Sequence, residues 1–199
     1  MAAFARARRF GPLALSLWLA FAPASARAIE TEAEAGWRLL KQPGAVALMR
    51  HADAPGTGDP SEFRLGDCAT QRNLGAEGRA QAARLGQEFR RRGVAVSQML
   101  VSKWCRTRDT ATLMGLAPVV DAPDALNSFF ERRSEREAAT AALRRRLQAL
   151  PTDAAAVVMV THQVNITALT GVFPQSGEMV VLQRGPDGAH RPVARLQSR

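Results

Sequence analysis

The stretch ALMRHADAPG, residues 47–56, ends an apolar run abruptly in an arginine and a histidine. The run from Ala45 to Met49 has the length and unbroken apolar character of a strand that is buried on both faces. Arg50 and His51 follow at once, before a loop rich in glycine, proline and aspartate. The chain has only three histidines. A histidine beside an arginine at a strand end suggests a functional site, and further polar residues of that site are expected at the ends of other strands.

Strands and helices are predicted to alternate along the remainder of the 199 residues. Helices are expected over 31–40, 75–92, 104–115, 131–150 and 165–169, and strands over 98–101, 117–120, 155–160, 179–183 and near Val193. Loops are expected over 52–73 and 121–130, and a hairpin turn over 185–188. This alternation predicts one α/β domain, a three-layer α/β/α sandwich with a mostly parallel sheet. Ligands of such sheets bind beyond the carboxyl ends of the strands.

Polar side chains follow three of the predicted strands. They are Arg50 and His51, then Ser102 with Arg106 in the next helix, then Thr161 and His162. An arginine holds phosphate oxygens with a planar fork of donors and stays charged at any relevant pH. A neutral imidazole is a competent nucleophile toward phosphorus, and a second histidine, if protonated, would add a cationic donor. Either histidine alone is more often structural, but the set together predicts a phosphate pocket.

These motifs resemble the histidine phosphatase superfamily in their order and spacing. Arg50-His51, the run from Ser102 through Arg106 to Thr110, and Thr161-His162 carry the resemblance, together with Gly78 and Gln81 of the helix after the first loop. The resemblance implies a phosphoglycerate mutase-like fold. It also implies that His51 is the phosphorylated nucleophile and that Arg50, Arg106 and His162 complete the phosphate pocket, with Ser102 as a further ligand-binding group. No cofactor and no metal are expected.

Two positions depart from the family pattern. Ala52 stands where the first motif usually has glycine, and we expect this small methyl to be tolerated as long as the backbone keeps an allowed φ. Ser128 stands where phosphoglycerate mutase-like members carry a glutamate that acts as general acid. The acid is therefore Glu131, Asp53 or Asp124, or the leaving group needs none. Glu131 is slightly favoured, although a helix N-terminal acid is an equally good explanation for it.

The first 28 residues are predicted to be a secretory signal peptide. They have a basic beginning, an apolar stretch over 13–22 that is too short for a membrane span, and small residues for cleavage after Ala26 or Ala28. The mature histidine phosphatase domain would then cover residues 29–199 and be periplasmic or secreted, without stable membrane insertion. Its formal charge falls from +9 to +5, because the removed segment holds four arginines and no acid. This mild excess suits an anionic partner but does not indicate nucleic acid.

Export makes a disulfide between the only two cysteines, Cys68 and Cys105, plausible, with two buried free thiols as the alternative. Because Cys105 adjoins Arg106, the bond would tie the loop over 52–73 to the phosphate pocket as a substrate-facing lid.

The expected function is an exported phosphatase that acts on a phosphate monoester. A mutase is less favoured because export separates the protein from glycolytic intermediates. Some short exported members of the superfamily act on phosphate groups of lipopolysaccharide core sugars, so a small-molecule or glycolipid phosphate ester is the expected partner. Two alternatives remain: a catalytically idle module that binds phosphate or polyanions, and a protein phosphohistidine phosphatase.

Overall fold

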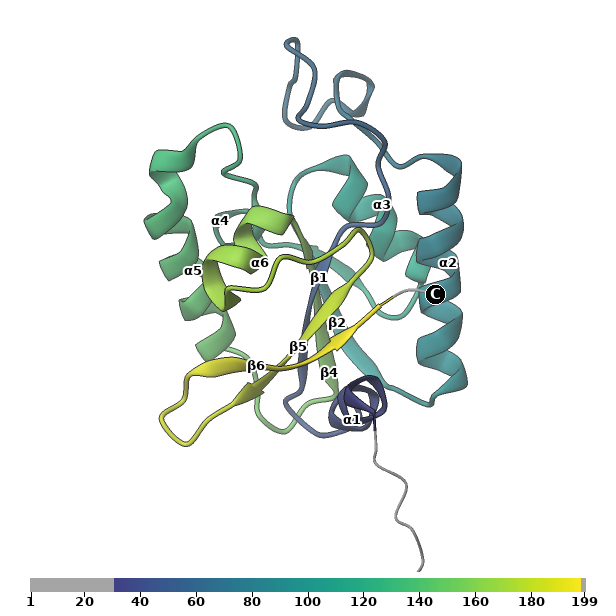
Figure 1. Ribbon diagram of the computed structural model, residues 1–199, viewed down its shortest axis with the longest axis vertical. Coiled ribbons are helices and arrows are strands. Elements are labelled where there is room, and N and C mark those ends of the chain that lie inside the picture. Colours follow the sequence, from purple (N-terminus) through teal and green to yellow (C-terminus); the bar gives the residue numbers. More distant parts are fainter. Residues whose placement is uncertain (1–30, 198–199) are drawn as a thin grey trace, which may run out of the picture.

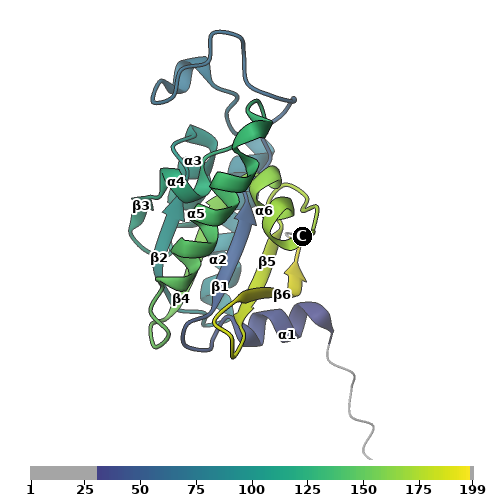
Figure 2. The same ribbon diagram turned by 90° about the vertical axis from the view of Figure 1, so that its left-hand side faces the viewer.

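The computed structural model describes residues 31–197, which form one six-stranded sheet with helices on both faces (Figures 1 and 2). The sheet order is β3-β2-β4-β1-β5-β6. The strands are β1 Val46–Arg50, β2 Val96–Val101, β3 Val119–Asp121, β4 Ala156–Thr161, β5 Met179–Arg184 and β6 His190–Leu196. Strands β1 to β4 are mutually parallel, and β5 and β6 are antiparallel additions beyond β1. The predicted mostly parallel sheet is confirmed.

Two apolar layers hold the helices to the sheet, because alternate residues of a strand face opposite sides. The helices are α1 Glu32–Leu39, α2 Ala76–Arg91, α3 Cys105–Met114, α4 Pro123–Leu126, α5 Arg136–Gln148 and α6 Gln163–Thr170. Met49 of β1 packs in the cluster that contains the buried residues of α1, α2 and α3. Leu48 packs in the opposite cluster with α4, α5 and α6. Figure 1 shows these two groups of helices on opposite sides of the sheet. The predicted α/β/α sandwich is therefore confirmed.

The structure corrects two predicted boundaries near residue 130. The expected loop over 121–130 contains the short helix α4, and the helix expected from residue 131 begins only at Arg136, after a 3₁₀ turn over Arg133–Glu135. Residues 131–138 are all exposed, and Thr140 is the first buried residue of α5. Helix formation depends largely on packing of an apolar face, which the first predicted turns lack. Glu131 consequently lies in a loop and not in a helix.

Neighbouring parallel strands end side by side, which brings their polar end residues together. Arg50 of β1 is in register with Thr161 of β4, and Val101 of β2 is in register with Val160. The long loop over 52–73 projects beyond this edge in Figure 1 and contains one 3₁₀ turn, Cys68–Thr70. The carboxyl edge of the sheet, with this loop above it, is where a ligand site is expected.

The segment predicted as a signal peptide lies outside the described residues. Across residues 31–197, no helix combines the length and the apolar character that crossing a membrane requires.

Candidate active site

His51 sits directly after β1 and is held in one tautomer. Its backbone N–H donates to Thr161 O at 3.0 Å, and its side chain is almost fully buried. The ring Nδ1 lies 2.8 Å from Ala52 O. A carbonyl oxygen can only accept, so Nδ1 carries the proton and Nε2 keeps its lone pair. Burial, reinforced by the charge of Arg106, lowers the pKa of His51 to about 3. The imidazole is therefore neutral at ordinary pH.

The loop after His51 is held by residues of α2 and α3. Ala52 N donates to Thr110 Oγ1 at 3.0 Å, and Asp53 N donates to Gln81 Oε1 at 2.9 Å. Gly78 of α2 packs so tightly beneath this loop that a Cβ there would lie 1.9 Å from Asp53 O. No residue other than glycine has a positive φ in the described part of the chain. Alanine is thus accommodated at position 52, as expected.

His162 follows β4 and faces His51, with ring centroids 5.6 Å apart in an edge-to-face arrangement. Burial, followed by the nearby charge of Arg106, lowers the pKa of His162 well below its usual value. The ligand-free site therefore holds two neutral imidazoles, not a neutral one beside a cation. The proton that would make His162 cationic has to come with an anionic ligand, whose charge favours the protonated ring.

Ser102 supports His162 and does not line the cavity. Its hydroxyl is fully buried and lies 2.9 Å from His162 Nε2 and 2.8 Å from Thr107 Oγ1. The backbone N–H of Trp104 also donates to it at 3.2 Å. These partners engage the hydroxyl inside the protein, and Ser102 is not among the residues that line the cavity. The ligand-binding place that the sequence suggested for Ser102 is corrected to a place behind the histidine.

Arg106, in the first turn of α3, forms a buried ion pair with Asp59. Its Nη1 lies 2.7 Å from Asp59 Oδ1 and its Nη2 lies 3.1 Å from Asp59 Oδ2. Nη1 also donates to Arg72 O at 3.2 Å. Nε is buried and has no hydrogen-bond partner among residues 31–197. Asp59 thus holds one edge of the guanidinium, while the Nε edge keeps unused donors.

Asp59 is itself fixed from a second side by the ring nitrogen of Trp104, which donates to Oδ2 at 2.9 Å. Burial alone would raise the pKa of Asp59, but the hydrogen bonds from Arg106 and Trp104 outweigh it and lower the pKa below the usual range. The carboxylate is therefore ionised and keeps Arg106 compensated in the ligand-free protein.

Two further arginines bring positive charge to the same place. Arg50 donates through Nη1 to Pro174 O at 3.0 Å, and its buried Nε also lacks a partner within the described chain. Arg72 donates through Nε to Gly58 O at 2.7 Å and through Nη1 to Ala54 O. Burial lowers the pKa of both guanidinium groups, which stay charged nonetheless. The cavity at this place is lined by four arginines, Arg132 included, and by two carboxylates. The excess of positive charge suits a phosphate dianion.

These groups line one cavity of about 760 Å³. His51, His162 and the three arginines form its base, and the 52–73 loop closes one side. Of the carboxylates, Asp59 and Glu131 line it, whereas Asp53 and Asp124 do not. A Cβ on Gly58 would lie 3.4 Å from Glu131 Oε1, so this carboxylate reaches across to the loop. Of the three acid candidates proposed from the sequence, Glu131 is thus the one placed at the cavity.

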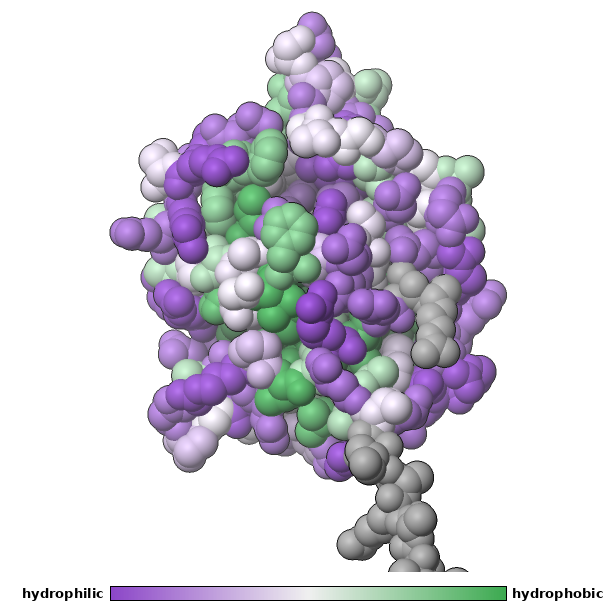
Figure 3. Space-filling view, viewed as in Figure 1, coloured by the Kyte–Doolittle hydropathy of each residue, from purple (hydrophilic) through white to green (hydrophobic). Residues whose placement is uncertain are grey.

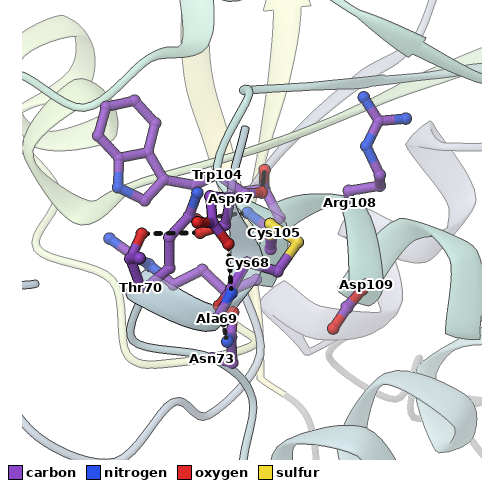
Figure 4. Close-up of a disulfide and its surroundings, with 12 residues drawn as sticks. Asp67, Cys68, Ala69, Thr70, Asn73, Trp104, Cys105, Arg108 and Asp109 are labelled. Atoms are coloured by element: carbon purple, nitrogen blue, oxygen red, sulfur yellow. Dashed lines mark hydrogen bonds between the residues drawn. A yellow bond between two sulfur atoms is a disulfide. The ribbon is translucent and has the colours of Figure 1, made fainter. Parts of the chain in front are cut away.

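The 52–73 loop is fastened to α3 by a disulfide between Cys68 and Cys105, whose Cα atoms are 5.7 Å apart (Figure 4). Beside it, Cys105 N donates to Gln71 Oε1 at 2.9 Å. Asp59 lies on the same loop and Arg106 is the next residue after Cys105. The bond therefore secures the segment that carries the partner of Arg106, which agrees with the expected lid.

Sequence reasoning did not find Asp59, Arg72 or Trp104. Asp59 and Arg72 belong to a loop without hydrophobic periodicity or a family motif that would mark them, whereas Trp104 lies within the run from Ser102 to Thr110 but was assigned no role. The one available signal is indirect: a buried arginine such as Arg106 needs an acidic partner, but the sequence does not say which acid. Among residues 31–197, no group of three or more histidine, cysteine or acidic side chains is placed to hold a metal ion.

Comparison with solved structures places the chain in a known fold. It is similar to the protein histidine phosphatase SixA complexed with tungstate, with a TM-score of 0.58 and 17% identity over 77% of this chain and 97% of that one. It is also similar to a candidate phosphohistidine phosphatase SixA from Nakamurella multipartitia, with a TM-score of 0.55 and 22% identity over 77% and 95% of the two chains.

A mycobacterial glucosyl-3-phosphoglycerate phosphatase matches with a TM-score of 0.51 and 15% identity over 77% of this chain and 98% of that one. No family model and no curated protein sequence matches the chain. At these identities the likeness concerns the fold, and it confirms the phosphoglycerate mutase-like fold implied by the sequence motifs.

Proposed function

Because the chain has the fold of the histidine phosphatases, we propose that it is a phosphatase that hydrolyses a phosphate monoester through a phosphohistidine on His51. One observation carries the proposal. His51 is buried and neutral, and its Nδ1–H donates a hydrogen bond to Ala52 O. Arg50 and Arg106, each with an unpartnered buried Nε donor, line the same cavity. A nucleophilic nitrogen thus lies among donors for the oxygens of the group that it would attack.

The reaction would proceed in two displacements. The Nε2 lone pair of His51 attacks phosphorus, a P–N bond forms, and the P–O bond to the leaving group breaks with its electron pair going to the ester oxygen. That oxygen takes up a proton and the alcohol leaves. A water oxygen then attacks phosphorus, the P–N bond breaks and Nε2 regains its lone pair. Water passes one proton back to the group that protonated the ester oxygen, and monohydrogen phosphate leaves.

The arginines would stabilise the charge on the equatorial oxygens in both steps. Arg106 offers its Nε edge because Asp59 occupies the opposite one. Asp59 is in this scheme a positioning residue, which acts through Arg106. Its lowered pKa makes it a poor proton donor.

Glu131 is the proposed source of the leaving-group proton, since it lines the cavity and reaches the loop opposite. If the leaving group needs little help, no acid is required. Ser128 stands in place of the family's glutamate. This observation supports a second candidate function, the hydrolysis of protein phosphohistidine, whose leaving group needs less help from an acid. The similarity in fold to the protein histidine phosphatase SixA also supports this second candidate.

The proposal extends to location. A signal peptide over residues 1–28, cleaved after Ala26 or Ala28, would deliver the domain of residues 29–199 to the periplasm or the exterior. N-terminal sequencing of the exported protein would test this directly. A start at residue 1 would contradict the proposal.

The protein of residues 29–199 is tested on p-nitrophenyl phosphate, on a panel of sugar phosphates and on a phosphohistidine peptide. It should hydrolyse at least one of these substrates. His51→Ala should abolish turnover, whereas His190→Ala, which alters a histidine outside the cavity, should not. Phosphate trapped on His51 by rapid quenching would establish the intermediate. Phosphate binding without turnover by the wild type would instead show the idle binding module. Activity confined to the phosphohistidine peptide would establish the second candidate function.

A further inference from the structure

Exposed apolar side chains gather at the mouth of this cavity. Five large apolar residues are exposed within residues 31–197, and three of them line it: Leu65 at 44%, Phe130 at 37% and Phe173 at 60% exposure. They come from three segments far apart in the chain: the 52–73 loop, the connection before α5 and the connection after α6. In Figure 3, apolar surface borders the hollow beneath the projecting loop. We call these three residues the apolar rim.

An aromatic wall continues from the rim to the reacting centre. Phe63 stacks on Trp104 with ring centroids 5.3 Å apart and planes 17° apart, and both rings line the cavity. Trp104 in turn contacts the ring of His162 edge to face, with centroids 5.1 Å apart. Aromatic surface thus reaches His162 within the same cavity that the apolar rim lines.

Soluble proteins seldom expose contiguous apolar surface without a binding purpose. The base of this cavity offers cationic donors, and its upper part offers aliphatic and aromatic contacts. A ligand that satisfies both has an anionic head and an apolar body. A polar sugar phosphate would leave the rim uncovered.

We propose that the apolar rim and the Phe63–Trp104 wall form a subsite for an aliphatic or aromatic group esterified to the phosphate. This inference rests on the proposed function and deepens it, because it names the substrate class as amphiphilic phosphate esters. Such an ester can be a small soluble molecule or the phosphorylated part of a lipid. The chemistry of recognition is the same in both.

The first experiment measures binding without turnover. Decylphosphonate and phenylphosphonate, whose C–P bonds are not cleaved, should bind the wild-type chain of residues 29–199 at least tenfold more tightly than methylphosphonate. Phe173→Ala should reduce that preference about tenfold, in line with the apolar area that the ring would bury. Val193→Ala, which truncates an exposed apolar residue outside the cavity, should leave it unchanged. Equal affinity for the three phosphonates would overturn the inference.

The second experiment measures hydrolysis of esters whose alcohols have similar acidity, decyl phosphate and glycerol phosphate. Decyl phosphate should show the higher kcat/KM, and Phe173→Ala should lower that value by a clearly larger factor than it lowers the value for glycerol phosphate. A phosphatidic acid offered as a soluble short-chain monomer and embedded in vesicles separates the two sources of the apolar group. Turnover of the monomer alone indicates a small soluble ester, and turnover of both indicates a lipid. Turnover of every ester at equal efficiency would refute the subsite alone. Selective phosphonate binding without any turnover would refute the proposed phosphatase and leave the subsite standing.

Discussion

Removal of the disulfide should destabilise the protein by a calculable amount. Cys68 and Cys105 are 37 residues apart in the sequence. A cross-link over this distance restricts the unfolded chain by about 4 kcal/mol on the chain-entropy model. Cys68→Ala/Cys105→Ala should therefore lower the free energy of unfolding by up to about 4 kcal/mol. The native fold should persist, because the clusters on both faces of the sheet contain neither sulfur atom.

The same double variant should weaken phosphate binding while retaining some activity. Asp59 lies on the loop that the disulfide fastens, and a looser loop would hold Arg106 less firmly. The hydrogen bonds from Arg72 to Gly58 O and Ala54 O remain, however, and they hold the two ends of the loop together independently of the disulfide. We therefore expect the KM for p-nitrophenyl phosphate to rise more than kcat falls.

Urea unfolding of the oxidised wild type and of the double variant measures the difference in stability. Dithiothreitol provides the control, since it should bring the wild type toward the variant and leave the variant unchanged. A difference below about 1 kcal/mol would refute the entropic reasoning. Two free thiols in the exported protein by mass spectrometry would refute the bond itself.

Three further predictions concern charged and titrating groups of the site. Asp59→Asn should release Arg106 and thereby lower kcat/KM about tenfold and weaken the binding of inorganic phosphate. Tighter binding of phosphate would instead mean that Asp59 competes with the ligand. His51 has a folded pKa of about 3 against about 6.5 unfolded, so between these values the unfolded chain binds the extra proton and stability falls as pH falls. Between pH 7.5 and 5 the part of this loss that comes from His51 is about 2 kcal/mol. His51→Asn should lack that part in urea titrations, while His162, whose pKa is also lowered, keeps its own contribution. Glu131→Gln should lower kcat more for an alkyl phosphate, whose leaving group needs a proton, than for p-nitrophenyl phosphate; an equal effect on both would eliminate this acid.

The sequence by itself was sufficient for the sheet and for the position of His51 at the end of its first strand. The apolar run before Arg50 is a local pattern, and a strand buried on both faces follows from composition over a few residues. Because parallel strands end at one edge, their polar end residues had to meet there, which brought His51 and His162 together. The approximate limits of the longer helices followed in the same way, except where no apolar face anchored the first turns of α5. The short helix α4 was expected to be loop and was missed.

Only the tertiary structure decided what surrounds those residues. The pairing of Arg106 with Asp59, the place of Ser102 behind His162 and the neutral state of both imidazoles all depend on burial and on contacts between distant segments. The apolar rim is of the same kind, since Leu65, Phe130 and Phe173 come from three separate loops that carry no periodic signal. Local patterns determine which elements form, because they depend on near neighbours in the chain. Charge states and the shape of a cavity depend on distances through space, which only the folded chain sets.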